Sequence, residues 1–476
     1  MEDTAKSVRV RMAPSPTGNL HLGTAYATLW PYLFAKKNKG TFLLRIEDTD
    51  VERSKKEFEE NIIQGLKWLG LDWDEGPYHQ MERLDAYKKA LDQLIDKERA
   101  YYCFCTQEEL DTERKRLQLE KKPLIYSGKC RSLSTEEASD KIKKGAQFVV
   151  RLKVASDRGV IKFEDILHGE IAVDSRLIGD TVIMRRSGIP LYNFAVVVDD
   201  IDMKISHVIR GEDHISNTPK QVLIFEAMDS PLPKFAHYPV ILNQDRVGKL
   251  SKRAGSTSVD DYKKDGYLSE VLINYLALLG WSPKNDKEIF TKEELITIFD
   301  LKDMGKAPAA WNEQKLDWLN GEYIRAMSDE ELTIRLQGFL VDHPAKDKIS
   351  VLVPLIKERI KKLSDFVPLT NFIYDEPEYD LEVFEKLKIK NFVEVLEQIK
   401  ERLGSMKNPW NSETFEKIFR DLSDELNITA GDMFQLIRVA VSGQLVTPPL
   451  FESIQIIGEE IIKKRIENLL KKLKNI

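Results

Sequence analysis

Cysteine is scarce in this sequence, and its scarcity excludes a scaffold held together by disulfides. The 476 residues contain three cysteines, and two of them, Cys103 and Cys105, are separated by a single residue. Such a set is typical of a reducing compartment. The N-terminus lacks the apolar run of a signal peptide, and no apolar stretch is long enough to span a bilayer. We therefore expect a cytoplasmic protein that makes no membrane contact.

An excess of positive charge is also missing. Lysine and arginine total 72 against 78 acidic residues, a net charge of −6, which argues against purely electrostatic binding to nucleic acid. A nucleic-acid partner would have to meet local basic surfaces, for which the candidates are Arg114–Arg116, Lys357–Lys362 and the lysine-rich C-terminus. Each of these is more typical of a solvated helix face. The apolar content of 42% predicts a soluble globular protein, and the length suggests three or more domains.

The most informative segment that is present runs from Arg11 to Thr24. Apolar residues alternate with arginines up to Met12, which predicts a short strand with one buried face. Prolines and a glycine then interrupt regular structure, and a helical pattern begins near Gly23. His21 would lie at this strand–loop–helix junction, where unpaired N–H groups and a partial positive charge suit phosphate. A proline-rich connection with a surface histidine is the alternative that this segment alone leaves open.

A second segment, Lys249–Arg253, places two lysines and an arginine within five residues. Gly248 and Gly255 flank it, which favours a loop with hinges. Lysine is a compact point charge that suits the negative charge developing during nucleotidyl transfer. An ordinary solvated basic loop is the alternative for this segment on its own.

The two segments, in this order and more than two hundred residues apart, resemble the two signature motifs of class I aminoacyl-tRNA synthetases. Three further segments, Leu44–Asp50, Tyr192–Asp200 and Val208–His214, resemble the glutamate branch, the glutamyl-tRNA synthetases of the bacterial kind. The resemblance covers essentially the whole chain. It implies an ATP-dependent ligase that converts L-glutamate to glutamyl-adenylate and transfers it to the 3′-terminal adenosine of the glutamate tRNA. It further implies ATP with Mg²⁺, L-glutamate and that tRNA as ligands, and a monomer.

Local patterns predict an α/β fold at the start of the chain. Phe42–Ile46 is a predicted strand, and the apolar stripe in Phe58–Leu69 predicts a helix. Similar signals resume with Phe194–Val198 and Ile205–Ile209, while Thr218–Gln221 is typical of a capping box with proline in the first helical turn. The alternation indicates a Rossmann-like, doubly wound parallel sheet.

An all-α region is expected to follow this α/β part. From about Met327 onward the patterns are those of amphipathic helices, and no alternating strand pattern of any length occurs. In the family, this helical end distinguishes the bacterial glutamyl enzymes from relatives with β-barrel anticodon domains. The predicted domains are the first half of the catalytic domain (1–99), an inserted acceptor-stem-binding domain (100–193), the second half of the catalytic domain (194–243), a lysine-loop and stem-contact helical domain (244–327) and a helical anticodon-binding region (328–476) with a break near 386.

The resemblance also assigns residues to ATP. It implies His21, Lys249 and Lys252 as catalytic residues that act by positioning and electrostatics rather than by covalent chemistry. The implied ATP-binding residues are Pro14, Thr17, Gly18, His21, Gly23, Thr24, Lys249, Leu250, Ser251, Lys252 and Arg253.

Glutamate needs cations for its two carboxylates and an anion for its ammonium group. Arginine can hold a carboxylate through two N–H groups, and Arg11 and Arg210 lie at carboxyl ends of predicted strands, where doubly wound folds bind ligands. The resemblance implies that Arg11 takes the side-chain carboxylate and Glu47 the ammonium group. The implied glutamate-binding residues are Arg11, Ala13, Ser15, Glu47, Tyr192 and Arg210. Asp48 and Asp50 are expected to cap the helix that follows them.

One position departs from the family pattern. Some members place an asparagine that contacts the substrate where Val196 stands here, so that contact cannot exist in this chain.

The cysteines raise a separate question. Cys103, Cys105, Tyr126 and Cys130 resemble the zinc site of some glutamyl synthetases, and thiolates suit structural zinc. The fourth ligand would be Tyr126 or a water, because Ser132 stands where some relatives have histidine. Three free cysteines are the alternative.

Three other functions stay open at this point. A glutamyl synthetase of relaxed specificity would also charge the glutamine tRNA. A non-catalytic RNA-binding paralogue would usually lack the histidine or the lysines, whereas His21, Lys249 and Lys252 are all present. Another nucleotidyltransferase acting on a small acid would leave the long helical C-terminal region without a purpose.

Overall fold

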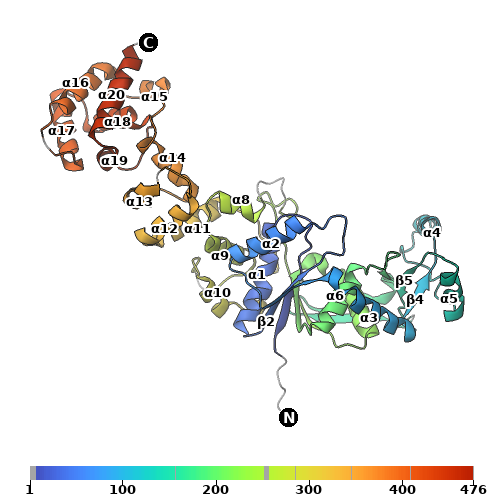
Figure 1. Cartoon of the computed structure of the whole chain (residues 1–476). Helices are drawn as coiled ribbons and strands as arrows, with labels where there is room; N and C mark the ends of the chain where they lie inside the picture. The colour runs from blue at the N-terminus through green and yellow to red at the C-terminus, as the bar shows by residue number, and fades with distance from the viewer. Residues whose placement is uncertain are drawn as a thin grey trace. The chain divides into compact units, whose positions relative to one another are not determined.

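A computed structural model describes residues 7–155, 157–250, 257–284, 286–344, 346–407 and 409–474 (Figure 1). The chain forms two compact units, the first made of Met1–Lys263 with Ser269–Glu313 and the second of Lys264–Leu268 with Gln314–Ile476. Within the described ranges, no helix is long and apolar enough to cross a membrane.

The first unit contains a central sheet of mostly parallel strands and a smaller antiparallel sheet. Its strands are β1 (Arg9–Met12), β2 (Thr41–Ile46), β3 (Glu75–His79), β4 (Ala100–Cys103), β5 (Val149–Leu152), β6 (Val160–Asp165), β7 (Gly169–Asp174), β8 (Val182–Met184), β9 (His207–Gly211) and β10 (Lys234–Tyr238). Strands β1, β2 and β3 pair in that order, and a second sheet has the order β7-β6-β10-β9. The two sheets meet where β1 lies beside β9, and Ser206 N, just before β9, donates a hydrogen bond to Arg9 O over 2.9 Å. The resulting order, β3-β2-β1-β9-β10, is that of a doubly wound sheet, so the predicted fold class is confirmed.

Helices cover both faces of this sheet. The helices of the first unit are α1 (Leu22–Lys37), α2 (Lys56–Trp68), α3 (Leu84–Asp96), α4 (Gln107–Leu119), α5 (Thr135–Lys143), α6 (Tyr192–Asp202), α7 (Thr218–Ala227), α8 (Val259–Lys264), α9 (Ser269–Gly280), α10 (Lys292–Ile298) and the start of α11 (Glu313–Ala326). Helix α1 lies against the face that carries Phe42, whose ring meets Tyr32 edge-on. The next residue, Leu43, packs on the opposite face with apolar side chains of α3, α6 and α7, as the alternation of side chains along a strand requires.

The burial of β1 differs from the sequence prediction. One buried face was expected, but Val10 and Arg11 are both buried, with exposed fractions of 0% and 5%. Helical layers cover both sides of a strand in this fold, so that a charged residue there needs a buried partner. Arg11 finds that partner in Asp200.

The predicted helix caps are wrong. Thr218 is the first residue of α7 rather than its cap, and its hydroxyl is occupied by Arg210; the proline in the first turn is confirmed. Asp48 accepts a hydrogen bond from Met81 N, and Asp50 binds Arg53, so neither carboxylate caps α2. In these cases the side chain that the local sequence assigned to the cap forms its hydrogen bond with another residue instead of with the helix end.

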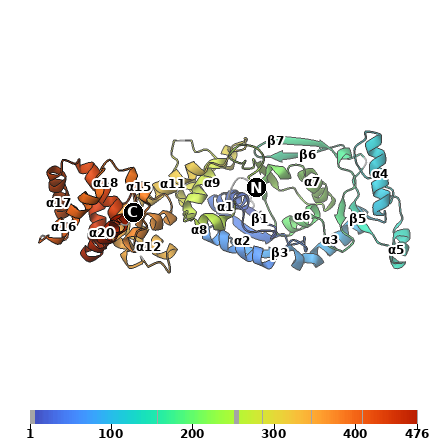
Figure 2. The ribbon, with the colours of Figure 1, turned by 90° about the horizontal axis from the view of Figure 1, so that it is seen from above.

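The segment predicted as an insertion has two structural parts. Strands β4, β5 and β8 form an antiparallel sheet, beside which α4 and α5 lie in both views (Figures 1 and 2). The β6–β7 hairpin, by contrast, extends the catalytic sheet, because Asp165 of β6 pairs with Phe235 of β10 in parallel. The proposed boundaries at 99 and 193 stay predictions.

The second unit is helical. Its helices are the remainder of α11, α12 (Asp329–Phe339), α13 (Ile349–Ile356), α14 (Phe366–Thr370), α15 (Leu381–Glu385), α16 (Phe392–Gly404), α17 (Ser412–Glu425), α18 (Ala430–Ser442), α19 (Leu450–Ile457) and α20 (Glu459–Lys474). Over the described residues that follow Met327 there is no strand, which confirms the all-α prediction for this region. Two of these amphipathic helices are α17, on which Phe415 and Phe419 are buried, and α20, on which Ile462 and Ile466 are buried.

Candidate active site

A cavity of about 630 Å³ opens at the carboxyl ends of β1 and β9. The order of the strands reverses between these two neighbours, and doubly wound folds bind ligands at such a point. Most of the predicted site residues line the cavity: Arg11, Ala13, Pro14, Ser15, His21, Gly23, Thr24, Glu47, Tyr192, Arg210, Lys249 and Leu250. Thr17 and Gly18 belong to the same loop but are not lining residues, and Ser251, Lys252 and Arg253 lie outside the described residues.

One end of the cavity is formed by the start of α1. His21 is the N-cap of this helix, and its Nδ1 accepts the Gly23 N–H over 3.0 Å. A nitrogen that accepts carries no proton, so the neutral ring has its proton on Nε2, a donor that phosphate oxygens accept. A Cβ at Gly23 would lie 3.2 Å from that Nδ1, which explains why glycine suits this position.

Both ends of the segment that contains the lysine loop are anchored at this cavity. Leu250 N donates to Ile241 O over 2.9 Å on one side, and Leu22 N of α1 donates to Thr257 O over 2.8 Å on the other. Lys249 Nζ lies 2.9 Å from Asp213 Oδ2, and both side chains are exposed. Because an exposed ion pair contributes little free energy, a polyanion can replace Asp213 as the partner of Lys249 with little loss of stability.

Arg210 presents an unused donor inside the protein. Its Nε donates to His237 Nε2 over 3.1 Å and its Nη2 to Thr218 Oγ1 over 2.7 Å. Its Nη1 is buried and has no hydrogen-bond partner. Burial lowers the pKa of Arg210. Since buried N–H groups are nearly always paired, this one indicates the place of an anionic ligand.

A buried charge network lies beneath the cavity. Arg11 grips Asp200 through Nε and Nη2, at 3.0 and 3.2 Å. Arg45 Nη1 lies 2.8 Å from the same carboxylate, and its other nitrogens lie 3.5 Å from Asp199 and from Glu47. Although burial pushes the pKa of Asp200 upward, Arg11 and Arg45 hold that pKa below its usual value. Asp200 therefore stays ionised.

Asp199 extends the network away from the cavity. Its carboxylate accepts hydrogen bonds from Arg83 Nε at 2.8 Å and from the Tyr87 hydroxyl at 2.9 Å. The arginines of this cluster (Arg11, Arg45 and Arg83) are thereby matched by the carboxylates of Glu47, Asp199 and Asp200. Paired charges of this kind are the usual condition for burying ionised groups.

Burial also tunes the groups that face the cavity. It raises the pKa of Glu47 to about 7, against the opposing effects of Arg45 and Arg11. Burial and the nearby Glu47 raise the pKa of Tyr192 to about 12. Burial lowers the pKa of His214 to about 4, with a further contribution from Arg210, and its Nδ1 lies 3.1 Å from the Tyr192 hydroxyl. His214 is therefore neutral near pH 7.

Sequence reasoning missed several of these residues. Arg45, Asp199, Asp200 and His214 belong to the quoted motifs, yet none was given a role, and Asp213 was missed as well. A signal was available for the first three, because each is a charged residue next to a strongly apolar run in a predicted buried element. Their partners could not be read from the sequence.

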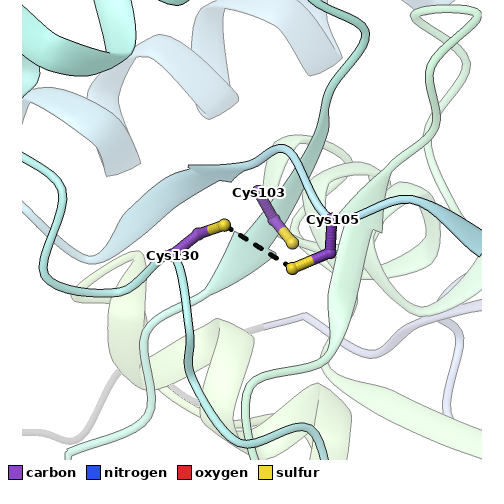
Figure 3. Close-up of side chains that lie close together, drawn as sticks. All are labelled: Cys103, Cys105 and Cys130. Atoms are coloured by element: carbon purple, nitrogen blue, oxygen red, sulfur yellow. Dashed lines mark hydrogen bonds between the residues drawn. The ribbon is translucent and has the colours of Figure 1, made fainter. Parts of the chain in front are cut away.

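The cysteines converge, as predicted for a metal site. The thiol sulfurs of Cys103, Cys105 and Cys130 all lie within 4.8 Å of one another, and Figure 3 shows the three side chains pointing toward a common point. The Tyr126 hydroxyl lies 3.5 Å from Cys103 Sγ and 3.3 Å from Cys105 Sγ. This donor set fits tetrahedral zinc with three sulfurs and one oxygen.

Comparisons with known proteins agree with the geometry. The family described as "tRNA synthetases class I (E and Q), catalytic domain" matches residues 7–318, and the "Anticodon binding domain" family matches residues 325–470. A glutamate–tRNA ligase of Aquifex aeolicus is 46% identical over 473 residues, which cover 98% of this chain and 99% of that protein. Glutamate–tRNA ligase 1 of Caldanaerobacter subterraneus subsp. tengcongensis is 42% identical over 472 residues, 98% of either chain. The crystal structure of a glutamate tRNA ligase from Elizabethkingia meningosepticum in complex with its amino acid superposes with a TM-score of 0.87 at 33% identity, covering 98% of this chain and 99% of that one.

The raised pKa of Glu47 predicts a pH-dependent difference in stability. Between pH 4.5 and about 7 the folded protein holds a proton that the unfolded chain has lost, so this group's contribution to stability falls as pH rises through that window. Glu47→Gln removes the effect. As pH rises from 4.5 to 8, the free energy of unfolding of the variant should increase relative to that of the wild type by roughly 3 kcal/mol. Thermal unfolding of both proteins at the two pH values measures the change.

The exposed Glu60 of α2 provides the matched control. Glu60→Gln should show the same difference from the wild type at both pH values, because its side chain is solvated. If the Glu47→Gln difference were equally independent of pH, Glu47 would titrate as an ordinary surface carboxyl.

Proposed function

The chain belongs to the glutamyl-tRNA synthetases of class I, and we propose that the cavity between β1 and β9 is where it activates L-glutamate with ATP before transfer to the glutamate tRNA. The observation that carries this proposal is the pattern of charge in one cavity. Two buried arginines and one buried carboxylate, Arg11, Arg210 and Glu47, complement two carboxylates and an ammonium group. His21 and Lys249 face the same space and suit phosphates.

Each group then has a role in binding. Arg11 receives the side-chain carboxylate of glutamate through N–H groups that Asp200 does not use, and Arg210 Nη1 adds a donor from the second cation. Glu47 binds the ammonium group. The hydroxyls of Tyr192 and Ser15 complete the polar contacts, and the backbone at Ala13 lies beside them.

Activation follows from this placement. An oxygen of the glutamate α-carboxylate attacks the α-phosphorus of ATP, the bond to the β-phosphate oxygen breaks, and pyrophosphate leaves. His21 donates from Nε2 to phosphate oxygens as charge develops, and Lys249 and Lys252 neutralise the triphosphate. Mg²⁺ bound with ATP would supply further positive charge at the phosphate oxygens. The terminal 2′-hydroxyl of the tRNA then attacks the mixed anhydride and releases AMP.

Zinc is the second part of the proposal. Cys103, Cys105, Cys130 and Tyr126 hold a structural zinc ion at the start of the segment that is expected to meet the tRNA acceptor end. The buried thiols and the phenol oxygen that converge on one point support this assignment. A monomeric state and a cytoplasmic location complete the expectations.

Charging of purified tRNAs with labelled glutamate tests the function. The protein should transfer glutamate to the glutamate tRNA, and labelled glutamine should not be transferred. Transfer to the glutamine tRNA as well would identify a synthetase of relaxed specificity. Folded protein that transfers glutamate to neither tRNA would contradict the proposal and favour the non-catalytic paralogue.

His21→Asn separates catalysis from helix capping. Asparagine is a good N-cap and can still accept the Gly23 N–H, but it lacks the Nε2 donor. We expect kcat for ATP–pyrophosphate exchange, measured with tRNA present, to fall about 10²- to 10³-fold. The melting temperature should change by less than about 2 °C. A kcat within threefold of the wild type would exclude the proposed contact with phosphate.

Metal analysis of the purified protein tests the zinc site. Wild type should contain about one zinc per chain, and Cys105→Ser should lose it together with some thermal stability. Tyr126→Phe keeps all three thiols, so loss of zinc affinity in that variant would identify the phenol as a ligand. Metal-free wild-type protein with thiols that react freely would show three ordinary cysteines instead.

A further inference from the structure

A chain of buried hydrogen bonds runs from β6 through β10 to Arg210. Asp165 Oδ2 lies 2.7 Å from His237 Nδ1, and His237 Nε2 accepts from Arg210 Nε over 3.1 Å. Asp165 is 3% exposed, His237 0% and Arg210 7%. They lie near the carboxyl ends of β6, β10 and β9, which run parallel to one another. Arg210 lines the substrate cavity, whereas Asp165 and His237 do not.

The hydrogen bonds of Asp165 determine which nitrogen of His237 carries the proton. Oδ1 accepts from the backbone N–H groups of Leu167 and His168, at 2.9 and 3.0 Å, so the carboxylate cannot turn. Burial pushes the pKa of Asp165 upward, but its hydrogen bonds hold that pKa below the usual value. Oδ2 of the ionised group can only accept. His237 must therefore carry its proton on Nδ1, which leaves Nε2 with a lone pair for the Arg210 N–H.

This arrangement fixes the guanidinium of Arg210. Nε is held by His237, and Nη2 by the hydroxyl of Thr218, which can donate onward to His237 Nε2 or to His214 O. The remaining buried nitrogen, Nη1, has no partner. Because hydrogen bonds to Nε and Nη2 already fix the side chain, Arg210 loses little conformational entropy when a carboxylate binds to Nη1.

We propose that Asp165 and His237 are positioning residues for glutamate: Asp165 holds His237 in the Nδ1-protonated form, and His237 thereby aligns Arg210 with a substrate carboxylate. The proposal rests on the role of Arg210 given above. It gives the β6–β7 hairpin, which lies in the segment predicted as an insertion, a part in amino-acid binding.

Asp165→Asn is the decisive change because it reverses the donor order at constant volume. The two backbone N–H groups retain the amide oxygen, so the amide nitrogen faces His237 Nδ1 and donates to it. The imidazole proton then moves to Nε2, where it opposes the Arg210 N–H. We expect the KM for glutamate, in tRNA-dependent pyrophosphate exchange, to rise tenfold or more, and the KM for ATP to stay within twofold.

Three variants make the result specific. His237→Phe, which removes the acceptor but can retain the ring stacking on Phe235, should raise the glutamate KM in the same way. Asp180→Asn alters another buried carboxylate, which binds Tyr101 and Arg131 and does not line the cavity, and should leave the KM for glutamate within twofold. In an Arg210→Gln background, Asp165→Asn should add nothing to the glutamate KM.

The outcomes separate the two proposals. An unchanged glutamate KM in Arg210→Gln would overturn the role of Arg210 itself. A raised KM in Arg210→Gln with unchanged values in folded Asp165→Asn or His237→Phe would overturn the positioning role alone. An equal rise in the KM for glutamate and for ATP in those variants would also overturn it, because that is the result of general loss of structure.

Discussion

The buried carboxylate of Asp200 is the contact on which the rest of the site depends. It binds Arg11 through two hydrogen bonds and Arg45 through a third, and Arg45 in turn reaches Glu47. Arg11 and Glu47, which we propose contact glutamate, are thus both linked to one carboxylate on α6. Buried ion pairs are weak evidence for stability, but the loss of one partner typically costs 3–5 kcal/mol, because it leaves a charge uncompensated. The constraint is therefore one of geometry: the site forms only when β1, β2 and α6 are correctly packed.

Topology explains why the other components reach the same cavity. Where the strand order reverses between β1 and β9, the cavity opens at the carboxyl ends of these strands, and Arg11, Arg210 and residues at the start of α1 line it together. The anchors at Ile241 and Thr257 bring both ends of the lysine segment to the same place. Arg11, Arg210 and Glu47, which we propose bind glutamate, are buried, while Lys249, which we propose binds phosphate, is exposed and forms an ion pair with Asp213. This contrast suits a site that fixes an amino acid but must admit ATP and release pyrophosphate.

The sequence was sufficient to predict residues whose role follows from local structure or from a motif. Arg11, Glu47 and Arg210 were identified from motifs and line the cavity, and the doubly wound sheet and helical second unit were predicted correctly. It was insufficient where a side chain is defined by a distant partner. Asp165 and His237 meet across 72 positions, and Arg45 and Asp200 across 155. The failed caps have the same cause, since tertiary contacts with Arg210 and Met81 took Thr218 and Asp48 away from the local roles that their neighbours suggested.

The most direct test is the affinity of the Asp200→Asn variant for glutamate, measured by calorimetry with tRNA present and compared with its affinity for ATP. Asparagine keeps the size of the side chain but removes the charge that binds Arg11 and Arg45. If Asp200 organises the site, the dissociation constant for glutamate will rise at least tenfold while that for ATP changes less than twofold. A folded variant that binds glutamate as tightly as the wild type would contradict this account.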